Sequence, residues 1–284
     1  MKYLILGKNV NKGVQGDDSG LLKEYFELGW EVVGSRIDLI CLYNEGCLNE
    51  NEITLVTIDD RMFFYTKYYN SVISYDEFVK LNVPQEDICG DWPTRHESYF
   101  GFANFRAFIN PKTLEYVRKD KDFDLIFNGF DLDGAIQPEE PFVTMCIRKR
   151  DWCSDRNSDI SFYQKIVDGI KNKFPIYVAG KGNEEFCEMN GINYVPRLKD
   201  YVSLIKNKNC RCLVTQSTGL AVLALTCAET DIHLVDHAGA SDINGLNAIS
   251  GGKPIHFFSK GLTPYYNLED STAKCIIERV LEQS

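Results

Sequence analysis

A small polar stretch, Thr215-Gln216-Ser217-Thr218-Gly219, directly precedes an apolar run in the second half of the chain. The pattern predicts a strand that ends in a tight turn, followed by a helix that opens at Ser217, Thr218 and Gly219. The first N–H groups of a helix lack partners within it, and the helix dipole places partial positive charge beside them. These residues therefore predict a phosphate-binding site. The alternative is a polar turn that only caps its own helix.

Basic side chains follow two other predicted strands. Arg148 and Arg150 follow one strand, and Lys181 follows the next one, between two glycines that allow close backbone approach. Guanidinium groups at a strand end can clamp a pyrophosphate in bidentate fashion, although a solvated basic turn would have the same sequence. Glu229, at the far end of the predicted phosphate-binding helix, could bind ribose hydroxyls or could be a solvated helix terminus.

Two carboxylates could act as a general base. Asp17 and Asp18 lie in a glycine-rich loop at 7–20, between the first predicted strand and a predicted helix at 19–28. A carboxylate at the mouth of a helix can face a ligand cleft and accept a proton there. The alternative is a flexible loop with an acidic helix start, which the helix dipole also favours.

A second pair of carboxylates, Asp131 and Asp133, has the D-x-D spacing that holds a divalent cation and a diphosphate in one class of glycosyltransferases. Carboxylates with one residue between them are good ligands for hard cations. The pair also lies in a proline-rich stretch that reads as a linker, which favours a structural interpretation. The four histidines share no spacing and give no zinc signature, so we predict no metal site.

Apolar runs of strand length alternate with helix-period segments along the whole chain, which predicts an α/β fold with parallel sheets. Strands are predicted at 3–7, 31–34, 37–42, 53–58, 124–128, 142–147, 175–179, 193–195, 212–216 and 231–235. Helices are predicted at 19–28, 159–172, 183–189, 199–206, 218–228 and 268–283.

The length of 284 residues suggests two domains. Two prolines and a glycine after residue 130 mark the linker, so we predict an amino-terminal lobe at 1–135, a carboxyl-terminal lobe at 136–265 and a final helix within 266–284. Each lobe is expected to be a doubly wound, Rossmann-like sheet, with a cleft between the lobes. Ligands of such sheets bind beyond the carboxyl ends of the strands.

Composition narrows the class of function. A net charge of -10 argues against a nucleic-acid partner, which normally requires a basic face. The sequence has no apolar stretch of the ~18 residues needed to span a bilayer, so we expect no integral membrane segment. The ten cysteines form no regular framework and no C-x-x-C pair, which favours reduced thiols and a cytoplasmic location.

The two-lobed plan, the glycine loop after the first strand, and the order of arginines, Gly-Lys-Gly and Ser-Thr-Gly resemble the GT-B type glycosyltransferases. Gly16-Asp17 is similar to the Gly-Asp turn of heptosyltransferase-like members, whose aspartate is a catalytic base. Compact cytosolic members of this size are familiar from large DNA viruses and bacterial polysaccharide clusters. The resemblance implies a hexosyl- or pentosyltransferase whose final helix packs back on the first lobe.

The resemblance also implies a mechanism. The carboxyl-terminal lobe would bind a nucleoside-diphosphate sugar, UDP- or GDP-linked, and the amino-terminal lobe would bind a glycan acceptor. The implied donor-binding residues are Arg148, Arg150, Lys181, Ser217, Thr218, Gly219 and, at the ribose, Glu229. Asp17 or Asp18 would deprotonate the acceptor hydroxyl, which inverts the anomeric carbon. The helix start and the arginines would stabilise the leaving diphosphate without a metal or other cofactor.

Departures from subfamily patterns keep other functions open. The chain lacks the Glu-x7-Glu of retaining members and the His-x-Arg of fucosyltransferases. Polysaccharide pyruvyltransferases share the plan and an Arg-Asp pair comparable to Arg150-Asp151, but their usual Arg-x-His is replaced by Gln216-Ser217-Thr218. A metal-dependent glycosyltransferase that uses Asp131 and Asp133, and a nucleotide-sugar-binding protein without catalysis, are the remaining alternatives.

Overall fold

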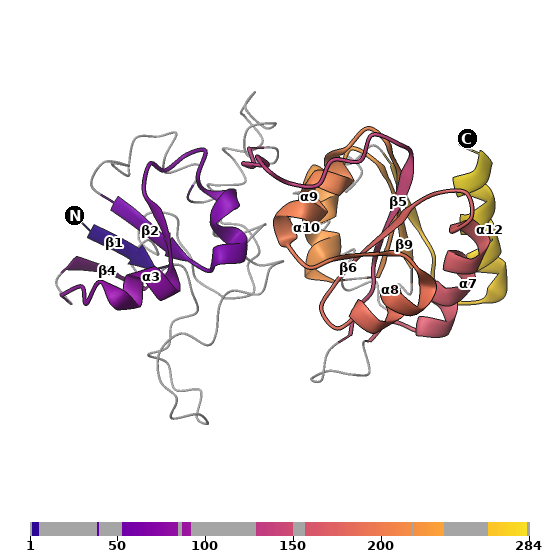
Figure 1. Ribbon diagram of the computed structural model, residues 1–284, viewed down its shortest axis with the longest axis horizontal. Coiled ribbons are helices and arrows are strands. Elements are labelled where there is room, and N and C mark those ends of the chain that lie inside the picture. Colours follow the sequence, from indigo (N-terminus) through magenta and orange to yellow (C-terminus); the bar gives the residue numbers. More distant parts are fainter. Residues whose placement is uncertain are drawn as a thin grey trace. The chain divides into compact units, whose positions relative to one another are not determined.

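The chain forms two compact units, Met1–Asp131 and Leu132–Ser284, in the computed structural model shown in Figure 1. None of the helices in the described segments combines the length and the apolarity needed to cross a membrane. The structure describes residues 2–5, 39, 53–84, 87–91, 129–149, 157–216, 218–235 and 261–282.

The first unit contains a parallel four-stranded sheet in the order β3-β2-β1-β4. A short 3-10 helix, η2 (Asp59–Phe64), follows β2, and α3 (Tyr75–Lys80) follows β3. Ser74 and Glu77 form a reciprocal capping box at the start of α3, which satisfies two backbone N–H groups there. The strands are β1 (Lys2–Ile5), β2 (Ile53–Thr57), β3 (Val72–Ser74) and β4 (Ile88–Asp91).

The predictions for this unit are confirmed only in part. The strands expected at 3–7 and 53–58 correspond to β1 and β2. The strand expected at 37–42 is wrong at Leu39, which is helical and fully buried. A short apolar run cannot distinguish a buried strand from a buried helix, which explains the error. The predicted elements at 19–28, 31–34 and 124–128 lie outside the described residues.

The second unit contains a parallel six-stranded sheet in the order β10-β9-β8-β5-β6-β7. All five neighbouring pairs are parallel, and β5 and β8 lie at its centre. The strands predicted for this half are confirmed, whereas β10, which begins with a glycine and ends with a proline, was not predicted. The strands are β5 (Phe142–Cys146), β6 (Ile176–Ala179), β7 (Asn193–Val195), β8 (Cys210–Gln216), β9 (Asp231–Val235) and β10 (Gly261–Pro264).

Helices cover both faces of this sheet (Figure 1). The helices α9 (Leu198–Lys206) and α10 (Gly219–Cys227) lie on one face, and α7 (Ile160–Ile170) and α12 (Asp270–Glu282) pack together on the other. The short α8 (Glu184–Asn190) follows β6. Alternate residues of β5 point to opposite faces, so Val143 and Met145 join the core under α7 and α12. This is the doubly wound plan that the sequence predicts.

The final helix packs within the second unit. Ala273, Ile276 and Val280 of α12 are buried in the same core as α7. Gly169 of α7 permits this close approach, because a Cβ there would lie 2.6 Å from the side chain of Ile277. The apolar face of α12 is therefore occupied by α7, and packing of the final helix on the first lobe stays a prediction.

The linker between the units is fastened along α9 by side-chain hydrogen bonds. Asp200, 2% exposed and paired with Arg197 at 2.6 Å, accepts from the backbone N–H of Ile136 at 3.1 Å. Ser203 donates to the Ile136 carbonyl at 2.8 Å, and Asn207 donates to the Pro138 carbonyl at 3.0 Å. The backbone groups of Ile136 and Pro138 in the linker are thus hydrogen-bonded to side chains of α9 and the residue after it.

His233 of β9 is a buried neutral base. Its side chain is 2% exposed, and its Nδ1 lies 3.0 Å from the hydroxyl of Tyr265, whose ring stacks on it. Burial, assisted by the nearby charge of Arg279, lowers the pKa of His233 from 6.5 to about 4. The unfolded chain therefore binds a proton between pH 6.5 and 4 that the folded protein does not.

We expect the second unit to lose stability as the pH falls from 6.5 to 4, by up to about 3 kcal/mol from His233 alone. Urea unfolding midpoints at pH 7 and pH 4.5 measure this for the wild type and for His233→Gln. The variant should lose less stability between the two pH values. An equal loss in both proteins would show that His233 does not carry the effect.

Candidate functional site

The candidate site lies at the carboxyl edge of the second sheet. The strands β6, β5 and β8 are neighbours and end at Ala179, Cys146 and Gln216 on the same edge, because all three are parallel. The chain proceeds from β5 outward through β6 and β7, then returns to β8 on the other side of β5. The loops after β5 and β8 therefore diverge, and a doubly wound sheet opens a ligand crevice at such a switch point.

The start of α10 faces this edge. Thr218 is the N-cap residue: its Oγ1 accepts from the N–H of Ala221 at 3.2 Å, and its carbonyl accepts from the N–H of Val222 at 3.0 Å. The N–H groups of Gly219 and Leu220 have no acceptor within the helix. Thr218, Gly219 and Leu220 are all partly exposed. Capping and anion binding are therefore compatible, because they use different N–H groups.

Carboxylates distinguish α10 from its neighbours. The helices α8 and α9 carry Glu184 and Asp200 in their first turns, and Asp159 caps α7. A carboxylate in the first turn offsets the positive end of the helix dipole and repels an anion. The first turn of α10 contains no acidic residue. Among α7, α8, α9 and α10, it is the helix start best suited to a phosphate.

The turn after β6 is folded tightly against the end of β5. Gly180 has a φ of 116°, and a Cβ at this position would lie 2.3 Å from the carbonyl oxygen of Ile147. Asn183, 1% exposed, donates from its amide to the carbonyls of Ile147 and Gly180, both at 2.9 Å. The turn thereby caps the carbonyl of the first residue after β5 and leaves Lys181 exposed at its tip.

Lys149 lies across the same turn. Its Cδ is 3.4 Å from the position that a Cβ of Gly182 would occupy. A backbone hydrogen bond, a hydrogen bond with the Tyr194 hydroxyl and the charge of Lys149 together lower the pKa of Glu184. Burial and this hydrogen bond raise the pKa of Tyr194 to about 12, so Tyr194 stays protonated. Two lysines thus approach the edge over the Gly180–Asn183 turn.

Arg148 lies at the carboxyl edge, but its side chain is mostly buried. Its side chain is 7% exposed, whereas Lys149 and Lys181 are exposed. Its backbone N–H donates to the hydroxyl of Ser158 at 2.8 Å, and that hydroxyl donates to the side-chain oxygen of Gln216 at 2.7 Å. Most of the guanidinium surface of Arg148 is thus covered, and its side chain lies beneath the carboxyl edge of the sheet.

The site residues predicted from the sequence are distributed as follows. Arg148, Lys181, Thr218 and Gly219 lie at the carboxyl edge of neighbouring strands. Glu229 does not: α10 runs antiparallel to the strands, so its end lies at the amino edge, where Glu229 pairs with Lys206 at 3.4 Å. The ribose contact of Glu229 stays a prediction. Four predicted site residues lie outside the described residues, namely Asp17, Asp18, Arg150 and Ser217.

The D-x-D pair belongs to the linker. Asp131 accepts from the Thr66 hydroxyl at 3.2 Å and donates its backbone N–H to the Phe63 carbonyl at 3.1 Å, which fastens it to the first unit. Asp133 is exposed two residues later. Across the segments that the structure describes, no group of three or more His, Cys, Asp or Glu side chains is arranged to hold a metal ion.

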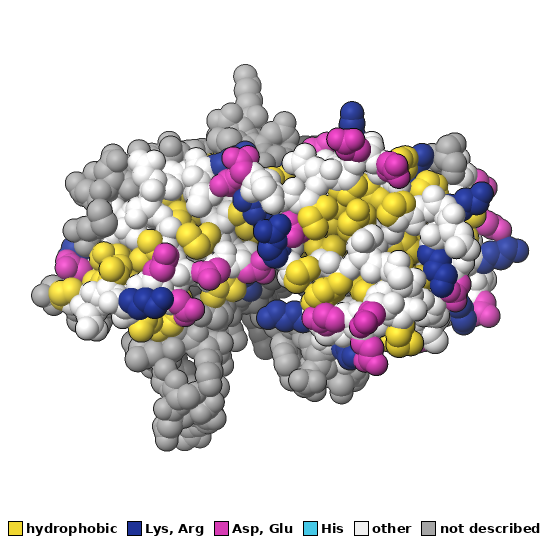
Figure 2. Space-filling model, viewed as in Figure 1, with side chains coloured by type: hydrophobic (Ala, Val, Ile, Leu, Met, Phe, Trp, Pro, Cys, Tyr) yellow, Lys and Arg dark blue, Asp and Glu magenta, His cyan; other side chains and the backbone are white. Residues whose placement is uncertain are grey.

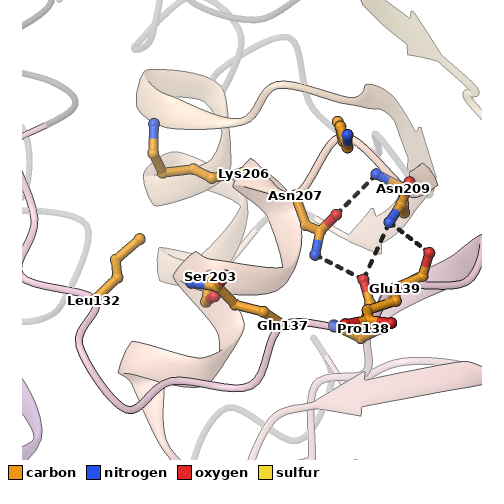
Figure 3. Close-up of a pocket in the computed structure, with 9 residues that line it drawn as sticks. Leu132, Gln137, Pro138, Glu139, Ser203, Lys206, Asn207 and Asn209 are labelled. Carbon is orange, nitrogen blue, oxygen red and sulfur yellow. Dashed lines mark hydrogen bonds between the residues drawn. The ribbon is translucent and has the colours of Figure 1, made fainter.

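A pocket of about 680 Å³ lies at the opposite, amino edge, beside the linker (Figure 3). Lys206 and Lys208 line it together with Asn207 and Asn209. The two asparagine amides point at the linker carbonyls. Both donate to the carbonyl of Pro138, Asn207 at 3.0 Å and Asn209 at 3.2 Å. The polar groups of this pocket are thus engaged in holding the linker, which gives it a structural explanation.

Charge on the surface is mixed. Figure 2 shows acidic and basic side chains interspersed over the described parts of the visible face, without a continuous basic surface there. Such a surface suits a small anion held by a local cluster better than a long polyanion.

Two solved structures resemble the whole chain. Comparison with protein-family models and with curated proteins found no match. The ADP-heptose LPS heptosyltransferase II of E. coli has a TM-score of 0.50 and 11% identity, with 100% of this chain and 98% of that chain covered. The E. coli heptosyltransferase WaaC with ADP has a TM-score of 0.52 and 10% identity, with both chains fully covered.

The chain has the GT-B fold of these heptosyltransferases. The fold class expected from the sequence is thereby confirmed, with parallel sheets in both units. Because the sequence identities are only 10% and 11%, these two similarities establish the fold alone. Fold alone does not assign an activity, which must be argued from the site.

Several residues of this site were given no role from the sequence, although Gln216 lies in the polar stretch at 215–219. Lys149, Asn183, Ser158 and Gln216 all act through contacts between segments far apart in the chain. Of these, Asn183 carried a usable signal, because asparagine after Gly-Lys-Gly and before a helical run is typical of a helix start. The structure shows that its amide turns inward to β5 instead, with no side-chain bond to its own helix.

We expect Gly180→Ala to destabilise the protein by about 3 kcal/mol or more, because the new Cβ would collide with the Ile147 backbone at a positive φ. Gly191→Ala is the matched control. Gly191 has a φ of 65° and open space around it, so that variant should lose only about 1 kcal/mol. Urea unfolding of both variants measures the difference, and equal losses would contradict the close approach of this turn to β5.

Proposed function

We propose that the protein is a glycosyltransferase that moves a sugar from a nucleoside-diphosphate sugar to a hydroxyl of a glycan acceptor. The observation that carries the proposal is the start of α10: a capped helix start without acidic residues, partly exposed, at the switch point of a doubly wound sheet. Oriented N–H groups at such a place bind phosphate. The GT-B fold supports the proposal, because both similar structures are heptosyltransferases.

In this proposal the second unit binds the donor. The N–H groups of Gly219 and Leu220 hold the diphosphate, with Ser217 and Thr218 beside them. Lys181 and Arg150 neutralise its charge, and Arg148 supports them from within the edge. Hydrogen-bond donors and positive charges held in place before the reaction stabilise the charge that develops on the leaving diphosphate.

The first unit supplies the base in this proposal. Asp17 or Asp18 takes the proton from the acceptor hydroxyl, whose oxygen attacks the anomeric carbon as the bond to the diphosphate breaks. The sugar is transferred with inversion, and the nucleoside diphosphate leaves with its charge held by the basic residues, without a metal ion. We infer hexosyl or pentosyl transfer from a UDP- or GDP-linked sugar; ADP belongs in the test because one similar structure is a complex with ADP.

Binding of nucleoside diphosphates tests the donor site. Lys181→Ala should weaken binding of the preferred nucleoside diphosphate about tenfold, because it removes a charge-assisted contact. Lys208→Ala, an exposed lysine at the amino edge, is the matched control and should bind like the wild type. Titration calorimetry of ADP, UDP and GDP, with magnesium and with chelator, measures both. Equal affinity of the two variants would remove Lys181 from the site.

Binding only with magnesium would instead favour the metal-dependent alternative, with Asp131 and Asp133 as its ligands. Tight binding without sugar transfer would favour a binding protein, and transfer of pyruvate would favour the pyruvyltransferase alternative.

Transfer itself tests the base. Asp17→Ala and Asp18→Ala should each leave nucleotide binding unchanged, and one of them should lower kcat by about 100-fold to 10000-fold, the usual contribution of a general base. Radiolabelled sugar transfer to a panel of glycan acceptors is the measurement. Full activity in both variants would show that neither aspartate is the base.

A further inference from the structure

Two buried polar side chains, those of Ser158 and Gln216, join the backbone of Arg148, just after β5, to the carboxyl end of β8. The side-chain oxygen of Gln216 accepts from the Ser158 hydroxyl at 2.7 Å, and the same hydroxyl accepts from the backbone N–H of Arg148 at 2.8 Å. The backbone N–H of Ser158 returns a bond to the Arg148 carbonyl at 2.9 Å. Gln216, Ser158 and Arg148 are 5%, 8% and 7% exposed, so these bonds are shielded from water.

This arrangement closes the base of the loop after β5. The chain leaves the sheet at Arg148 and returns at Ser158, one residue before the N-cap of α7. Because Ser158 binds both the N–H and the carbonyl of Arg148, it fixes the direction in which the chain continues into Lys149. The Ser158 hydroxyl has one proton, and Gln216 accepts it, so the orientation of the hydroxyl is fixed as well.

The other end of the arrangement is the start of α10. Gln216 is the last residue of β8 and lies two residues before Thr218, the N-cap of α10. At the opposite end, Lys149 lies across Gly182 in the turn that carries Lys181. Hydrogen bonds therefore run from Gln216, which leads into α10, to the backbone of Arg148, the residue before Lys149. The side chain of Lys149 in turn lies beside Gly182, the residue after Lys181.

We propose that Gln216 and Ser158 are positioning residues that hold the lysine side of the donor site at a fixed distance from the start of α10. This inference rests on the proposed function, because it assumes that a diphosphate binds between the two. A carboxamide suits this role, since it accepts the Ser158 proton without bringing a negative charge close to a bound anion.

Two substitutions break the arrangement and one preserves it. Ser158→Ala removes the hydroxyl, Gln216→Leu removes its acceptor, and Ser158→Thr keeps a hydroxyl. Ser203→Ala is the matched control, because Ser203 is also a buried serine of this unit that donates to one backbone carbonyl, but at the linker. All four are compared by thermal unfolding and by titration calorimetry with ADP, UDP and GDP, and by KM and kcat where transfer is measured.

We expect Ser158→Ala and Gln216→Leu each to weaken nucleoside-diphosphate binding about tenfold, and the double variant to bind no more weakly than either single variant. Ser158→Thr and Ser203→Ala should stay within about twofold of the wild type, and KM should rise more than kcat falls. Wild-type affinity in Ser158→Ala and Gln216→Leu, or an equal loss in Ser203→Ala, would overturn the positioning role alone. A wild-type protein that binds none of the three nucleotides would overturn the proposed function and the positioning role with it.

Discussion

The adjacency of β5 and β8 at the centre of the second sheet is the constraint on which the candidate site depends. The two strands are parallel neighbours, but the chain leaves β5 toward α7 on one face and leaves β8 toward α10 on the other. Two loops that diverge from adjacent strand ends cannot cover the space between them, so backbone groups and side chains converge there. Which helix covers which face therefore determines where a ligand can bind in this unit.

Backbone satisfaction determines which groups remain for a ligand. Asn183 donates to the carbonyl of Ile147, just after β5. The hydroxyl of Ser158 accepts from the N–H of Arg148, and that of Thr218 accepts from the N–H of Ala221. Each of these polar side chains serves the fold, because backbone groups at a buried edge require partners. The first N–H groups of α10 and the exposed amines of Lys149 and Lys181 are what the described part of this edge offers to an anion. These groups carry positive or partial positive charge, although the whole chain is acidic.

Most helices and strands of the second unit could be predicted from the sequence, because the pattern of apolar residues is regular there. Fully buried strands read as short apolar runs, and amphipathic helices such as α7 repeat their apolar residues every three or four positions. Prediction failed where that pattern is absent or ambiguous. The strand β10 contains Gly261 and Pro264, and Leu39 lies in an apolar run that also fits a strand. Elements of the first unit such as β3 and α3 are too short to show a period.

The common edge of several candidate residues was predictable from the sequence, but their contacts were not. Loops after parallel strands share an edge, so Lys181 and Thr218 could be placed together from their neighbours in the sequence. Glu229 was assigned to the ribose without regard to the direction of α10, whose end lies at the amino edge. The bond between Ser158 and Gln216 joins residues 58 positions apart, and no local pattern reports such a contact.

A crystal structure of the complex with whichever of ADP, UDP or GDP binds most tightly tests the central claim most directly. We expect the diphosphate to lie within hydrogen-bond distance of the N–H groups of Gly219 and Leu220, with the amine of Lys181 near its oxygens. A diphosphate at the start of α8, or in the amino-edge pocket beside Lys206 and Lys208, would contradict the assignment of the donor site to the switch point between β5 and β8.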